Sequence, residues 1–70
     1  MTEYVVIYEQ AEDGAWGAYL PDVPGVVALG ETHEEVADRI HEALEAYAAD
    51  LQDRSQLLPP PRHAAGVVSA

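Results

Sequence analysis

The sequence predicts an α+β domain with the element order β-β-β-α-β: a mostly antiparallel sheet of strand order 3-2-1-4 with one long helix on one face. Three short apolar runs separated by turn signals come first, a long amphipathic stretch follows, and one more short apolar run comes last. A right-handed crossover through the helix places the last strand beside the first and parallel to it. At 70 residues with no cysteine, the chain is predicted to be a single domain, residues 1–70, without a disulfide.

The first two predicted strands form a hairpin. Tyr4–Tyr8 is apolar at every position, which is typical of a strand that is buried on both faces. Asp13-Gly14 is a hairpin signal, and the second strand, Trp16–Leu20, follows it. Pro21 ends this strand, because proline has no N–H to donate to a neighbouring strand.

Consecutive local signals mark the third strand and the start of the helix. Pro24-Gly25 suits a type II turn, since proline presets φ and glycine accepts a positive φ. Val26–Leu29 is rich in β-branched residues, and Gly30 ends it. Thr32 with Glu35 three residues later forms a capping box, which predicts that a helix begins here.

The helix is predicted to run from about His33 to about Asp53. Its apolar residues recur at helical spacing and form one stripe. They are Val36, Ile40, Ala43, Leu44, Tyr47 and Leu51. Pro59–Pro61 cannot continue a helix, and Ala64–Val68 is predicted to be the last strand, with a frayed tail as the alternative.

One helix covers only one face of a sheet, whereas the first predicted strand is apolar on both faces. The second face is therefore predicted to need another protein. That protein is either a copy of this chain, in a homodimer or higher oligomer, or a different chain. Self-association is also the usual way in which so short a chain supplements its core.

The charge balance excludes some partners and favours others. The chain has 13 acidic side chains against 3 arginines and no lysine, for a net charge of −10. A nucleic-acid backbone would be repelled, so we expect no direct binding of DNA or RNA. Such a surface attracts basic partners or simply keeps the protein soluble. Because no apolar run approaches the ~20 residues of a membrane span and the N-terminus has no basic signal region, we expect no membrane contact and a cytoplasmic location.

The run from Pro21 to Val36 contains two motifs, P-D-V-P-G and G-E-T-H-E-E. An apolar strand and an aromatic strand precede them, and a proline cluster at 59–61 follows the helix. With these features, nearly the whole chain resembles the HicB-like antitoxin family. The matching residues are Pro21, Asp22, Pro24, Gly25, Gly30, Glu31, Thr32, Glu34, Glu35 and Ala43.

The resemblance implies a partial ribonuclease H-like module without nuclease activity. In the family, this module binds and masks a small basic mRNA-cleaving toxin, HicA, and many members append a DNA-binding domain that represses their own operon. This chain has Val26 where many members have cysteine. Its 70 residues stop about where the DNA-binding domain would begin, so we expect no such domain and no autorepression.

The sequence contains no complete catalytic or metal-binding set. Glu9 and Asp22 fall at strand ends, but two-metal chemistry needs further converging carboxylates. His33 and His41 are too far apart for the i,i+4 pairing of a zinc helix, and all three histidines, His63 included, are predicted to lie on the surface. No serine has a base beside it. We expect no enzyme activity, no cofactor and no metal.

The predicted function is that of an antitoxin whose acidic residues imitate the RNA phosphates that a basic toxin binds. The alternative is a self-associating structural or regulatory protein without a toxin. The candidate partner-binding residues are Glu9, Glu12, Asp13, Trp16 and Asp22. For Trp16 the alternative is a place in the core, and for Asp22 it is a role in the turn. The predicted structural residues are Pro21, Asp22, Pro24, Gly25, Gly30, Thr32 and Glu35.

Overall fold

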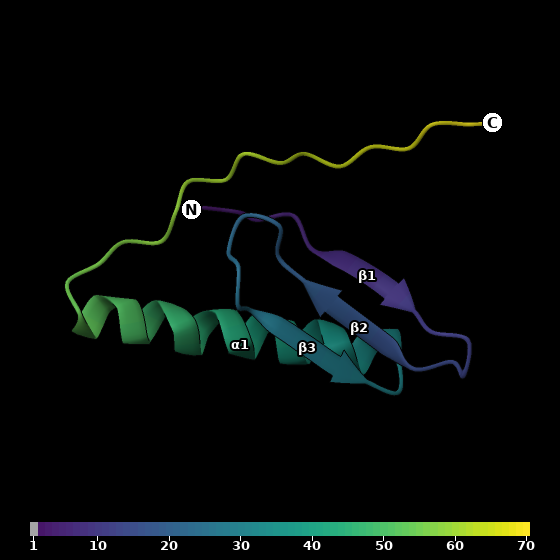
Figure 1. The fold of residues 1–70 in the computed structure, drawn as a ribbon, viewed down its shortest axis with the longest axis horizontal. Helices are drawn as coiled ribbons and strands as arrows, with labels where there is room; N and C mark the ends of the chain where they lie inside the picture. The colour runs from purple at the N-terminus through teal and green to yellow at the C-terminus, as the bar shows by residue number, and fades with distance from the viewer. Residues whose placement is uncertain (1) are drawn as a thin grey trace.

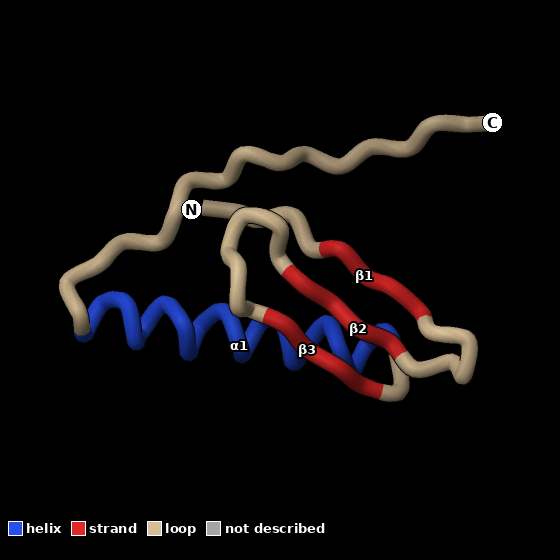
Figure 2. The backbone as a smooth tube through the Cα atoms, in the orientation of Figure 1, coloured by secondary structure: helices blue, strands red, loops and turns tan. Residues whose placement is uncertain are grey.

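A three-stranded antiparallel sheet lies across one helix in the computed structural model, which describes residues 2–70 (Figures 1 and 2). Met1, the first residue of the predicted domain, lies outside the described residues. The strands are β1 (Ile7–Gln10), β2 (Trp16–Tyr19) and β3 (Val27–Gly30), in the spatial order β1-β2-β3, and α1 spans His33–Asp53. The helix packs mainly over β2 and β3. The α+β class, the antiparallel order of the first three strands and the bounds of the helix are thus confirmed.

The first strand was predicted at Tyr4–Tyr8 but runs from Ile7 to Gln10. Its register places Ile7 opposite Tyr19, so a continued ladder would place Val5 opposite Pro21, which has no N–H. The chain also turns at this point, since the N–H of Val23 donates to the carbonyl of Leu20 at 3.1 Å. Residues 4–6 therefore have no strand to pair with.

The predicted fourth strand is not formed, and this part of the prediction was wrong. Residues 64–70 lie outside the sheet, so the predicted order 3-2-1-4 is reduced to β1-β2-β3 and β1 is an edge strand. Figure 1 shows the C-terminal segment leaving α1 and running past the N-terminal segment as an extended tail. Val67 and Val68 are 98% and 94% exposed. Ala64, Ala65 and Gly66 offer little apolar area to hold the tail against the sheet.

The predicted turn and helix cap are both present. Gly25 has φ +96°, and the N–H of Val26 donates to the carbonyl of Val23 at 3.3 Å, which closes the turn around Pro24-Gly25. At the helix start, Thr32 Oγ1 accepts from the N–H of Glu35 at 3.0 Å. In the return bond, the N–H of Glu31, one residue before the cap, donates to Glu35 Oε1 at 3.2 Å.

The core lies between the sheet and α1. Its buried members are Ala18, Leu20, Val23, Val26, Ala28, Val36 and Ile40. Tyr4, Val6 and Tyr8 pack against this cluster, as expected for residues that share one face of the first apolar run. Gly30 brings the sheet close to the helix, because an added Cβ would lie 2.8 Å from Cγ2 of Val36.

Candidate partner-binding surfaces

The face of the sheet that points away from α1 is apolar and largely uncovered; we name it the open face. Strand pairing aligns its members in two rows, with glycine at the centre of the second row. They are Ile7, Tyr19 and Val27 in one row and Glu9, Gly17 and Leu29 in the other. Three large side chains on this face are well exposed: Tyr19 by 41%, Val27 by 63% and Leu29 by 74%.

The open face contains a shallow apolar hollow of about 440 Å³. Gly17 is among the residues that line it, and Leu29 leans over this glycine, with Cδ2 3.3 Å from where a Cβ would stand. Within the described residues, the second face of the sheet is thus not covered by this chain. The exposure is greatest on β2 and β3, however, whereas Val5 and Ile7 of the first apolar run are half-buried.

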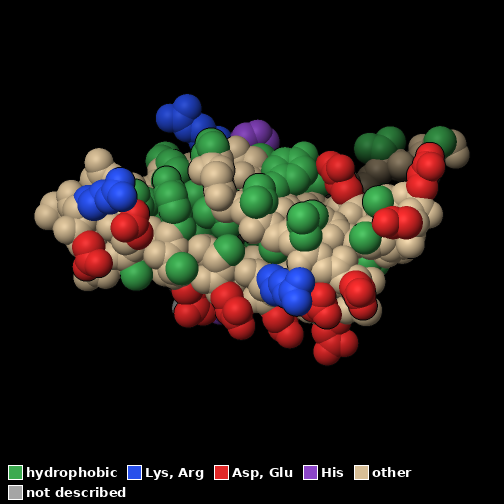
Figure 3. Space-filling view, turned by 60° about the horizontal axis from the view of Figure 1, so that its bottom comes forward, with side chains coloured by type: hydrophobic (Ala, Val, Ile, Leu, Met, Phe, Trp, Pro, Cys, Tyr) green, Lys and Arg blue, Asp and Glu red, His purple; other side chains and the backbone are tan. Residues whose placement is uncertain are grey.

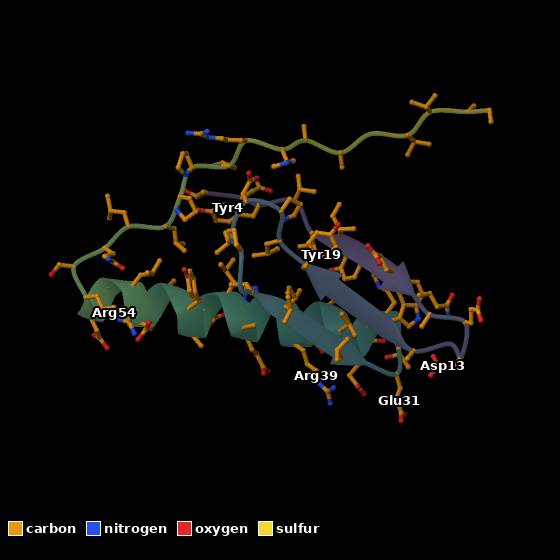
Figure 4. All side chains as sticks on the ribbon, viewed as in Figure 1. Tyr4, Asp13, Tyr19, Glu31, Arg39 and Arg54 are labelled. Carbon is orange, nitrogen blue, oxygen red and sulfur yellow. The ribbon has the colours of Figure 1, made fainter. Side chains whose placement is uncertain are left out.

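Acidic side chains gather on the other side of the molecule. Figure 3 shows a row of them along the lower border of the view and others at both ends of the molecule, with apolar side chains between. The β1–β2 loop meets the start of α1, so that Asp13 and Glu31 line one small hollow, and Figure 4 shows both at this end of the molecule. The exposed carboxylates here and along the outer side of α1 form what we name the acidic surface. Its members are Glu12, Asp13, Glu31, Glu34, Asp38, Glu42 and Glu45.

The five residues predicted to bind a partner do not form one surface. Glu12 and Asp13 belong to the acidic surface, and Asp13 Oδ1 also accepts from the N–H of Ala15 at 3.0 Å. Glu9 lies on the open face. Trp16 is half-buried against the core, on the helix side of the sheet. Asp22 follows the opposite end of β2.

Asp22 has a role that the sequence did not reveal. Its Oδ2 accepts from the backbone N–H of His63 at 3.1 Å, and its Oδ1 lies 2.6 Å from Nδ1 of the same residue. The side chain of Asp22 is only 4% exposed. The structural role of Asp22 thus includes a contact with the C-terminal segment, 41 residues away, and is not confined to the turn. The hydroxyl of Tyr4 donates to the carbonyl of Pro59 in the same segment.

Burial works to raise the pKa of Asp22, as it does for any carboxyl group. The hydrogen bond with the His63 side chain, the bonds from the backbone N–H groups of Arg62 and His63, and the charge of His63 act in the opposite direction. Together they outweigh burial and hold the pKa of Asp22 below its ordinary value. The carboxylate is therefore ionised at neutral pH and can only accept hydrogen bonds, so the proton of this contact sits on Nδ1.

His33 also makes contacts that its place in the sequence did not indicate. Its ring lies 4.2 Å from the ring of Tyr8 and 5.1 Å, edge-on, from that of Trp16. Two i,i+4 ion pairs with arginine lie along the helix: Glu35 with Arg39 at 3.2 Å and Asp50 with Arg54 at 3.4 Å.

Within residues 2–70, no three His, Asp or Glu side chains come together in a group that would hold a metal ion. In the same residues, no helix combines the length and the apolar character that a membrane crossing requires.

Comparison with known proteins identifies the family. The family model of the HicB-like antitoxin of bacterial toxin–antitoxin systems matches residues 4–70. The chain belongs to this family. A relative, the UPF0150 protein ssr1765 of Synechocystis, is 36% identical over 56 residues, which are 80% of this chain and 71% of the relative.

A solved structure shows the same fold. The N-terminal domain of the Burkholderia pseudomallei antitoxin HicB superimposes with a TM-score of 0.68. The match covers 93% of this chain and 69% of that chain at 20% sequence identity. At this identity the likeness concerns the fold alone. The predicted membership of the HicB-like family is confirmed, and the chain is an antitoxin module by family.

Proposed function

We propose that this HicB-like protein is a non-catalytic, single-domain antitoxin module that masks a small basic mRNA-cleaving toxin of the HicA type in the cytoplasm. The family match over residues 4–70 is the observation that carries this proposal. The partial ribonuclease H-like character of the module, the absence of direct nucleic-acid binding and the absence of a cofactor are parts of the same proposal.

The acidic surface supports a basic partner. Four of its members, Glu34, Asp38, Glu42 and Glu45, recur at helical spacing on the exposed side of α1. The row is continued at the helix start by Asp13 and Glu31. A line of carboxylates across one side of a protein attracts the Lys and Arg side chains that a ribonuclease uses to bind phosphates. The toxin would be masked because the same side chains cannot then hold RNA.

Of the predicted contact residues, Glu12 and Asp13 fit this surface best, since both are exposed at its end. Glu9 stays in the proposal as a residue at the edge of the open face. Trp16 is half-buried and would contribute only its exposed part. Asp22 holds His63, so a toxin would reach its carboxylate only after the C-terminal segment moves away.

The test is co-purification with the short Lys/Arg-rich protein that the neighbouring reading frame would encode. We expect a stable complex in which that protein no longer cleaves mRNA. Replacing Asp38 by Asn and Glu42 by Gln should slow association several-fold, whereas Glu3→Gln, an exposed acidic residue outside the acidic surface, serves as the control. Recovery of no basic partner from the native host would contradict the proposal.

A second candidate function is favoured by the open face, which a toxin bound to α1 would leave uncovered. Here the protein self-associates as a structural or regulatory protein and has no toxin. A genomic neighbourhood without any short basic reading frame would favour this candidate over the first.

A further inference from the structure

We infer that the open face is an interface between two copies of this chain, which pack sheet against sheet and leave both acidic surfaces outward. The assignment of the acidic surface to the toxin rests on the proposed function, whereas the contact between copies does not. Three features of the described residues support the inference: the charge of the open face, its shape, and the contact of Arg39 with the edge of β3.

Charge decides which partner binds the open face, a basic protein or a second copy of this chain. Glu9 is the single charged residue among the six of the open face, so a basic protein gains little by binding there. A second copy also has a net charge of −10, so the acidic parts of the two surfaces repel each other. The repulsion is weakest where carboxylates are scarce, as on the open face. Packed sheets lie about 10 Å apart and each helix adds about 10 Å behind its sheet. The two acidic surfaces are then separated by well over the Debye length of about 10 Å at 0.1 M salt.

Shape makes the open face complementary to itself. Leu29 lines the hollow of about 440 Å³ together with Gly17, and 74% of its surface is exposed. In a two-fold dimer through this face, the exposed part of Leu29 of each copy would pack against the hollow of the other. Two-fold dimers need such a patch, in which projection and hollow occur together on one surface.

The edge of β3 carries a charged side chain, which favours the face-to-face arrangement over pairing of two copies through this edge. Arg39 Nη1 donates to the carbonyl of Leu29 at 2.6 Å and lies 3.2 Å from Glu35 Oε1. Figure 4 shows Arg39 beside this strand. The guanidinium group bound to this carbonyl stands in the way of an incoming strand, and a charged side chain at an edge opposes such pairing.

The size of the face sets the strength of the dimer. Three strands of four residues present a small area, at the low end of stable interfaces. We therefore expect a dimer that forms in the micromolar range and dissociates on dilution, rather than one that persists at nanomolar concentration.

The experiment is sedimentation equilibrium of the full chain over about 1 to 200 µM, a range that brackets micromolar dissociation constants. The wild type should pass from monomer to dimer. Leu29→Glu should remain monomeric and keep the wild-type circular dichroism spectrum, since the side chain is mostly exposed. Leu57→Glu is the matched control: Leu57 is 93% exposed but follows α1, away from the open face, and this variant should dimerise as the wild type does.

Binding of the basic neighbouring protein separates the two proposals. Leu29→Glu should bind it with unchanged affinity. A monomeric wild type, or a Leu29→Glu variant that still dimerises while folded, overturns the inference and leaves the proposed function standing. Loss of toxin binding in Leu29→Glu, with Leu57→Glu unaffected, would show that the toxin occupies the open face and would also overturn the inference.

Discussion

Asp22 and His63 join the P-D-V-P-G turn to the C-terminal segment. The carboxylate accepts the backbone N–H of His63 at 3.1 Å and lies 2.6 Å from its ring Nδ1. Together with the bond from the hydroxyl of Tyr4 to the carbonyl of Pro59, this contact determines where the segment after the helix runs. Asp22 of the P-D-V-P-G motif therefore has a role inside the chain, in addition to any role at a partner.

Replacing Asp22 by Asn should weaken the pH dependence of stability under acidic conditions. The pKa of Asp22 is lowered in the folded state, so the ionised carboxylate stabilises the fold. This contribution to the free energy of unfolding is fully present above the ordinary pKa of 3.8 and is lost as the pH falls below that value. The wild type should lose stability over this range, and the variant should lose less of it. Thermal unfolding at pH 2 to about 5 measures the difference.

The control for this prediction is Asp53→Asn, which removes an exposed carboxylate at the end of α1. Amide hydrogen exchange adds a local readout, because the N–H of His63 should exchange faster in Asp22→Asn than in the wild type. Equal pH slopes for wild type and Asp22→Asn, or unchanged exchange at His63, would contradict the role given to the carboxylate.

Gly30→Ala should destabilise the fold by about 1–3 kcal/mol, the usual cost of overpacking a core. The new methyl group would stand 2.8 Å from Cγ2 of Val36, which is fully buried and cannot move aside. The matched control is Gly66→Ala, where no atom lies within 4 Å and the change should stay within about 0.5 kcal/mol. Urea unfolding of both variants measures the two differences.

Thr32→Ala should cost about 1 kcal/mol, because the N–H of Glu35 then loses the oxygen that accepts it at the helix start. Thr2→Ala makes the same chemical change at an exposed position outside the elements and is expected to be neutral. Chemical denaturation checks both, and a Thr32→Ala variant as stable as the wild type would show that water replaces the cap without cost.

Salt should act in opposite directions on the two proposed surfaces. Screening weakens the attraction between the acidic surface and a basic protein, so that affinity should fall as sodium chloride rises from about 50 to 500 mM. Screening also reduces repulsion between two chains of charge −10, so dimerisation should hold or strengthen over the same range. Sedimentation and titration at both salt concentrations test this, and a dimer that salt dissociates would contradict an apolar interface.

Local signals in the sequence predicted the parts of the fold that depend on local physics. The turn at Pro24-Gly25 and the cap at Thr32 depend on backbone angles and on hydrogen bonds that reach three residues at most. The helix followed from the periodicity of its apolar stripe, and its bounds, His33 and Asp53, are those of the structure. The motifs around these residues also carried the resemblance to the HicB-like family, which the comparison confirmed.

The surfaces were harder to predict, because exposure depends on which strands become neighbours. An apolar run at Tyr4–Tyr8 suggested that the uncovered face would centre on the first strand. Pairing placed the exposed side chains on β2 and β3 instead, at Tyr19, Val27 and Leu29. Alternation along a strand tells which residues share a face, but not which face the helix covers.

By itself, the sequence determined the class of fold, the cap, the turn, the helix and the family, because each of these follows from neighbours along the chain. Only the tertiary structure decided that Asp22 binds His63, that Arg39 lies at the edge of β3, and that residues 64–70 stay outside the sheet. These contacts join residues far apart in the sequence, and they form only when the strands and the helix pack around the core. Local sequence patterns do not specify how these elements pack.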